Sequence, residues 1–115
     1  MQSSKTSLKV KHNALKRIYK ECVSYNKEAS QDEAKLAKLK ADGKDEHDIK
    51  QMAQVLEETK AMVYNSRTRF DTWYDELADM VGQITDPKTM EENDYKDAKK
   101  TIEDLSSFRK GNVIA

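Results

Sequence analysis

The chain is poor in residues that break a helix, with three Gly and one Pro among 115 residues. Multistranded β folds need many turns rich in these residue types, so their scarcity argues against a β fold. A single Cys excludes a disulfide within the chain and fits a reducing compartment. No apolar stretch approaches the ~18 residues of a membrane span, and the N-terminus lacks a signal-peptide core. We therefore expect a soluble, intracellular protein that is mostly helical.

The chain also lacks an excess of charge of either sign. Its 21 Lys and Arg balance 21 Asp and Glu, so the formal net charge is zero. Charged residues nevertheless make up 37% of the sequence, well above the roughly 25% of an ordinary globular domain. This composition suits an elongated body with much surface per residue. The length predicts a single domain over residues 1–115.

The few helix breakers divide the chain into three helical segments. Gly43 can take the left-handed conformation that ends a helix, and Asp45 can cap the next one. Asp86 followed by Pro87 is typical of an N-cap and the first helical position. The predicted helices span about residues 4–41, 46–82 and 87–110.

Apolar residues in the first two segments recur at steps of three and four, the pattern of a coiled-coil seam. A fold-back near residue 44 pairs residues whose numbers add up to about 88, such as Ile18 with Phe70 and Leu15 with Trp73. One register therefore satisfies both helices. The expected fold is an all-α, elongated antiparallel three-helix bundle with a long coiled-coil-like hairpin. Its shorter third helix should cover the half of the hairpin that contains Phe70 and Trp73.

The residues that usually perform catalysis or bind metals are isolated in this sequence. Cys22 lies on the seam without a His at helical spacing, which is typical of a buried structural thiol. His12 and His47 have no second ligand nearby and are expected at the surface. Three scattered glycines cannot form a phosphate-binding loop. We therefore expect a protein that is not an enzyme and has no catalytic residues, cofactor or metal.

A basic stripe follows the start of the first helix. Residues 5–20 contain six basic side chains, Lys9, Lys16 and Lys20 among them, and no acidic one. Acidic residues of the facing segment should neutralise much of this charge, so a solvated face is favoured over nucleic-acid binding. We expect neither a nucleic-acid nor a membrane partner. The positive end can still steer the bundle toward an acidic protein.

An apolar strip lies beside the seam in the part of the hairpin that the third helix cannot reach. Val55 and Met62 are one heptad apart on this strip, and Tyr25 lies on the facing helix. Exposed apolar residues that follow one another on a helix are candidates for partner contact. The predicted partner-binding residues are therefore Val55, Met62, Tyr25, Lys9, Lys16 and Lys20.

Several runs of sequence resemble the tubulin-binding cofactor A family, and the resemblance extends over about residues 8–108. The runs are LKVK (8–11), YNKEA (25–29), DIKQ (48–51), VLEET (55–59) and EENDYKDA (91–98). Their order, spacing and breakpoints together are more specific than any one of them. The chain departs from some members by having Val63, Tyr64 and Asn65 in place of a proline in the second helix, which should leave that helix straighter.

The resemblance implies a cytosolic, cytoskeleton-associated protein that binds β-tubulin. In that family the protein captures β-tubulin released from the chaperonin, stabilises it and passes it toward assembly with α-tubulin, beside other tubulin-folding cofactors. It implies no nucleotide, metal or other cofactor, and no motif transfers individual binding residues. The alternative is a structural coiled-coil subunit that binds another helical or cytoskeletal protein. The sequence leaves open whether the protein is a monomer or a homodimer.

Overall fold

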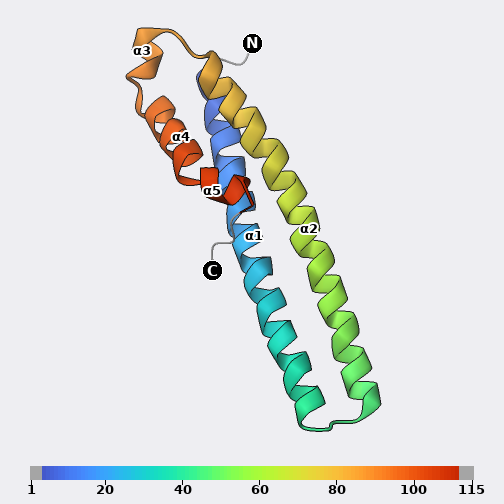
Figure 1. Cartoon of the computed structure of the whole chain (residues 1–115). Helices are drawn as coiled ribbons and strands as arrows, with labels where there is room; N and C mark the ends of the chain where they lie inside the picture. The colour runs from blue at the N-terminus through green and yellow to red at the C-terminus, as the bar shows by residue number, and fades with distance from the viewer. Residues whose placement is uncertain (1–3, 112–115) are drawn as a thin grey trace.

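The computed structural model describes residues 4–111, with side chains from Ser7 onward. Two long helices, α1 (Ser4–Ala41) and α2 (Glu46–Gln83), form an antiparallel hairpin. Three short helices return along it, namely α3 (Pro87–Met90), α4 (Asn93–Asp104) and α5 (Ser106–Arg109). The described body measures 65 × 26 × 18 Å, and Figure 1 shows the hairpin tip extending beyond the other helices. The expected domain bounds include residues 1–3 and 112–115, which lie outside the described residues.

The hairpin turns where the sequence predicted. Gly43 has a φ of +64°, the left-handed conformation that ends many helices. The N–H of Lys44 donates to the carbonyl of Leu39 at 3.0 Å and so satisfies a carbonyl at the end of α1. Asp45 then accepts a hydrogen bond from the N–H of His47 at 3.4 Å and caps α2.

Two ion pairs between α1 and α2 confirm the predicted register. Lys11 pairs with Glu76 at 3.2 Å, and Glu21 pairs with Arg69 at 3.3 Å. The midpoint of each pair lies close to residue 44, as a fold-back at that position requires. The hydrogen bond of Thr59 to Asp32 continues the pairing toward the turn. One antiparallel register therefore lets both apolar seams face each other.

The third segment is a bent series of helices, so the prediction of one continuous helix over 87–110 was wrong. A turn at residues 91–92 separates α3 from α4, and Leu105 separates α4 from α5. Local hydrogen bonds replace the missing helical ones: the N–H of Glu91 donates to Pro87 and Lys88, and the hydroxyl of Ser106 donates to Glu103. Neither break contains Gly or Pro, so the sequence pattern did not mark them.

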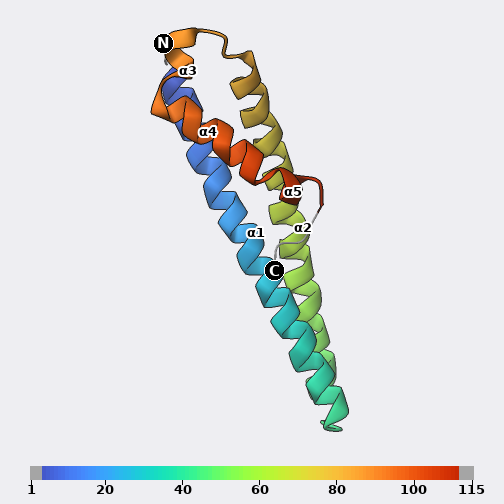
Figure 2. The same ribbon diagram turned by 60° about the vertical axis from the view of Figure 1, so that its left-hand side comes forward.

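The bends let the returning chain cross the hairpin and bury its apolar side chains. Figure 2 shows α4 running obliquely across α1, with α5 ending beside α2. The Phe108 ring of α5 then packs edge-on against Phe70, 4.8 Å between centroids, and against Tyr19, 5.1 Å away. Phe70 is fully buried, whereas Trp73, which the sequence placed in the same core, lies only partly buried at its edge.

His12 is part of the contact between α1 and α4, although the sequence predicted it at the surface. Its Nε2 lies 2.7 Å from the hydroxyl oxygen of Thr101, and only 8% of the residue is exposed. Burial lowers the pKa of His12, and the nearby charge of Lys16 lowers it further. Asp97 and Asp94 act in the opposite direction. The neutral imidazole is therefore the form that fits the folded bundle.

Candidate partner-binding surface

Helices α4 and α5 cover only one side of the hairpin. On that side Arg67 of α2 donates to the carbonyl of Arg109 at 3.0 Å. Arg69 lies two residues further on, about 200° around the helix axis, and pairs with Glu21 of α1 instead. Within residues 4–111, the side marked by Arg69 and Glu21 is therefore left without a third helix.

We call this uncovered side the open face. Residues seven positions apart lie on the same side of a coiled-coil helix, which extends the face along both helices. Its flanking residues are Ala14, Glu21, Glu28 and Lys35 of α1, and Val55, Met62, Arg69 and Glu76 of α2. Three shallow grooves follow one another along the α1–α2 seam on this face.

The middle groove has a volume of about 240 Å³. It is lined by Tyr25, Glu28, Val55, Glu58, Thr59 and Met62. Val55 is 42% exposed and Met62 39% exposed, so both apolar side chains face solvent. The structure thus brings together Tyr25, Val55 and Met62, the three apolar or aromatic members of the predicted partner-binding set.

A hydrogen-bonded pair stabilises the seam beneath the middle groove. The hydroxyl of Thr59 donates to the carboxylate of Asp32 at 2.7 Å and lies 3.1 Å from the carbonyl of Val55. Asp32 and Thr59 are both buried. Every buried side-chain nitrogen or oxygen among the described residues has a hydrogen-bond partner. The polar middle of the seam is therefore a satisfied structure that can support a fixed surface.

A groove continues the open face in each direction. The upper groove, of about 150 Å³, is lined by Val10, Lys11, Ala14, Trp73 and Glu76. The tip groove, of about 490 Å³, is lined by Lys35, Lys38, Leu39, Asp42, Lys44 and Met52. Trp73 and Val10 were missed as candidate contact residues because the heptad pattern places Trp73 on the seam and does not show which side α4 leaves open.

The predicted lysines lie on the other side of α1. Lys16 and Lys20 line a groove of about 270 Å³ against Thr101, Asp104 and Leu105 of the returning chain. Lys9 is exposed and lies seven residues before Lys16, on the same side. The predicted partner-binding residues therefore lie on two separate surfaces of the hairpin. The sequence could not show this, because it does not tell which side the third segment covers. Lys5 of the basic stripe lies outside the described side chains.

The buried thiol of Cys22 has the environment of a structural residue of the core. Burial raises the pKa of the Cys22 thiol, which disfavours the reactive thiolate. Among residues 4–111, no three His, Cys, Asp or Glu side chains gather closely enough to hold a metal ion. No helix in the described part of the chain is long and apolar enough to cross a membrane. The geometry provides contact surfaces on a long rod.

Comparisons with known proteins agree with this architecture. The family model for tubulin binding cofactor A matches residues 3–102. A tubulin-specific chaperone A from Gallus gallus is 34% identical over 99 residues, which cover 85% of this chain and 89% of that protein.

Solved structures show the same fold. The crystal structure of tubulin folding cofactor A from Arabidopsis thaliana has a TM-score of 0.81 and 33% identity, covering 90% of this chain and 96% of that one. The structure of human tubulin chaperone cofactor A has a TM-score of 0.79 and 28% identity, covering 90% of this chain and 99% of that one. A match this extensive in both sequence and structure shows that the chain belongs to the tubulin binding cofactor A family.

Proposed function

We propose that this protein is a tubulin-folding cofactor that captures β-tubulin released from the chaperonin and holds it against the open face. It then passes β-tubulin toward assembly with α-tubulin, beside other tubulin-folding cofactors in the cytoplasm. The names of its relatives, tubulin-specific chaperone A and tubulin folding cofactor A, support the tubulin-folding role. The observation that favours the open face is the pair of exposed apolar side chains, Val55 and Met62, in the middle groove.

The hairpin is suited to holding a partner by contact alone. Its two long helices are already paired along their length, so little conformational entropy is lost when a partner binds. Val55, Met62 and Tyr25 supply apolar area whose burial favours the complex. Such contacts chiefly slow dissociation, which is the property that a holding protein needs.

The basic side chains contribute at longer range. Lys9, Lys16 and Lys20 lie on the side that faces away from the middle groove. Their charge still acts over about 8–10 Å at physiological salt and can speed the approach of an acidic protein such as tubulin. The lysines and the apolar groove therefore serve two steps of one binding event.

A holding protein of this kind acts without a catalytic group. By binding β-tubulin it lowers the free concentration of an aggregation-prone partner, and that effect depends on concentration and affinity alone. We infer a one-to-one complex in which a single hairpin occupies its partner. The competing function is that of a structural coiled-coil subunit, for which the open face would already be covered by another copy or another helical protein.

Gel filtration separates the two functions. Purified protein is mixed with β-tubulin released by dissociation of the α/β heterodimer, without added nucleotide, and the fractions are examined for both chains. The proposal predicts one peak with the two chains in equal amounts. β-Tubulin that elutes alone would contradict it. Sedimentation of the protein by itself then shows whether a stable assembly already occupies the open face.

A further inference from the structure

The surface at the end of the hairpin farthest from α4 is basic and apolar, unlike the middle groove, which is flanked by glutamates. The tip groove combines three lysines, Lys35, Lys38 and Lys44, with the apolar side chains of Leu39 and Met52. At about 490 Å³ it is larger than the middle groove, which has about 240 Å³. It lies on the open face, continuous with the seam.

The ammonium groups of the three lysines that line this groove form no ion pair within residues 4–111. Lys38 lies in the last turn of α1, where a positive charge interacts favourably with the helix dipole. Lys35 lies a turn earlier and Lys44 lies beyond the helix end, so the dipole does not account for the cluster.

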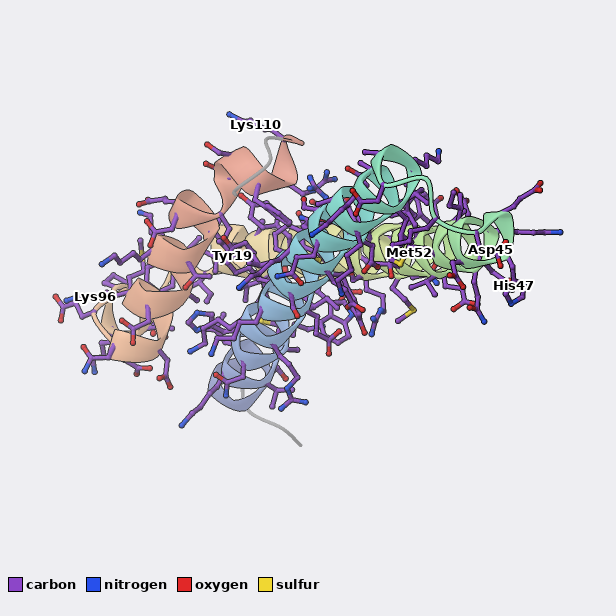
Figure 3. All side chains as sticks on the ribbon, turned by 90° about the horizontal axis from the view of Figure 1, so that it is seen from below. Tyr19, Asp45, His47, Met52, Lys96 and Lys110 are labelled. Atoms are coloured by element: carbon purple, nitrogen blue, oxygen red, sulfur yellow. The ribbon has the colours of Figure 1, made fainter. Side chains whose placement is uncertain are left out.

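The acidic residues near the tip leave this positive charge in excess. Asp42 is the one acidic side chain that lines the groove. Asp45 caps α2 by accepting a hydrogen bond from the N–H of His47. Asp45, Glu46 and Asp48 do not line the groove. Figure 3 shows Met52 on α2 near this end of the molecule, with Asp45 and His47 at the turn. The neighbouring middle groove has the opposite character, since Glu28 and Glu58 flank it.

The apolar floor of the tip groove is only partly buried, because no third helix of residues 4–111 covers it. Leu36, Leu39, Ile49 and Met52 form the last layers of the seam, yet each is only partly buried. Figure 1 shows that α4 and α5 end far above this region. A segment that inserts apolar side chains between the lysines would complete the seam, and its carboxylates would then meet unpaired ammonium groups.

We propose that the tip groove is a docking site for an acidic amphipathic peptide segment, in which Glu or Asp residues flank apolar ones. The lysines favour a peptide with acidic side chains. The side chains of Leu39 and Met52, which form the floor, favour a peptide that also carries apolar ones. This site lies on the same open face as the middle groove but shares no lining residue with it, and the case for β-tubulin rests on Val55 and Met62 of the middle groove. Peptide docking at the tip and co-elution with β-tubulin can therefore succeed or fail independently.

Fluorescence anisotropy with a labelled peptide, Glu-Glu-Leu-Glu-Glu-Leu-Glu-Glu, tests the proposal on the intact protein. The wild type should bind it saturably. Replacing Lys35, Lys38 and Lys44 together by Gln should weaken binding by roughly tenfold, since three charge pairs are lost. The matched control replaces Lys96, Lys99 and Lys100 of α4 by Gln; all three are exposed, and Figure 3 shows Lys96 pointing away from the hairpin. This control changes net charge equally and should alter binding by less than about twofold.

Two further peptides test the chemistry of the site. A peptide with Lys in place of Glu should not bind at the tip, and one with Ser in place of Leu should bind several-fold more weakly. Equal losses in the two lysine triples, or equal binding of the Leu and Ser peptides, would show attraction to charge alone and overturn the proposal. Failure of the wild type to bind the acidic peptide would also overturn it. Amide chemical shifts should change around Leu39 and Met52 and stay constant around Tyr25 and Met62.

Discussion

The guanidinium of Arg67 lies 4.4 Å from the centre of the Phe108 ring and donates to the carbonyl of Phe108. The same side chain donates to the carbonyl of Arg109 at 3.0 Å. One side chain in the middle of α2 therefore satisfies two carbonyls at the end of the returning chain and covers its last aromatic ring. It holds α5 against the hairpin and helps to decide which side of the hairpin stays open.

Replacing Arg67 by Ala should cost about 2 kcal/mol of unfolding free energy, because charge-assisted hydrogen bonds and a cation–π contact are lost together. Urea unfolding followed by circular dichroism measures this value. The control is Arg69→Ala, two residues away, which removes one exposed ion pair with Glu21 and should cost about 0.5 kcal/mol. Similar losses for the two variants would mean that Arg67 does not hold α5 in place.

The two large aromatic residues of α2 should differ in their effect on stability. Phe70 is fully buried against Tyr19 and Phe108, so Phe70→Ala should cost about 3–5 kcal/mol. Trp73 lies at the edge of the core and lines the upper groove, so Trp73→Ala leaves no closed cavity and should cost about 2 kcal/mol from lost apolar burial. Urea denaturation of each variant gives both values. An equal or larger loss for Trp73→Ala would place the tryptophan inside the core.

The hairpin was predictable from the sequence because its physical signals are local and repeat. Gly43 marks the turn, and the heptads that contain Ile18 and Phe70 fix one register. The breaks at residues 91–92 and at Leu105 were not predictable, because neither contains Gly or Pro. The contact of Phe108 with Phe70, which follows the second break, joins residues 38 positions apart and has no local signal in the sequence. The side of α1 that the returning chain covers could not be predicted either, because it depends on contacts between segments far apart in the sequence.

Among the candidate contact residues, too, those with a local sequence signal could be predicted and those that depend on the third segment could not. Val55 and Met62 could be recognised from their spacing, since apolar residues one heptad apart remain together on any helix. His12 was misplaced because a lone histidine beside a seam becomes buried only when α4 brings Thr101 against it. Lys9 and Lys16 were grouped with Val55 because sequence spacing within one helix does not tell which flank a third segment will occupy.

Acidification should loosen the contact between α1 and α4. The folded-state pKa of His12 lies below its ordinary value, chiefly through burial, whereas the unfolded chain has a pKa near 6.5. Below about pH 6.5 the unfolded state therefore binds a proton that the folded state does not, so stability is present above that pH and is lost as the pH falls. Lys16 favours this shift, and Asp94 and Asp97 oppose it.

Urea unfolding at a series of pH values between about 7 and 5 measures the effect. The His12→Gln variant keeps a group that can hydrogen-bond to Thr101 but does not titrate, so its stability should change less with pH than that of the wild type. The control is His47→Gln, at an exposed position beside the hairpin turn, which should retain the wild-type slope. If the two variants show the same slope, the pH dependence comes from groups other than His12.

The most direct test of the account compares the two sides of α2. Val55→Asp with Met62→Asp places two charges in the middle groove of the open face. Tyr64→Asp is the control on the other side: Tyr64 is 72% exposed and lies seven residues before Asp71, which pairs with Arg109 of α5. Both proteins should keep wild-type helicity and melting temperature, because exposed positions contribute little to stability.

Binding of each protein to β-tubulin is then titrated and checked by gel filtration. The double variant should bind at least about tenfold more weakly than the wild type, because two exposed apolar contacts are replaced by carboxylates. Tyr64→Asp should bind as the wild type does. Wild-type affinity in the double variant, or loss of binding in Tyr64→Asp alone, would contradict capture by the open face.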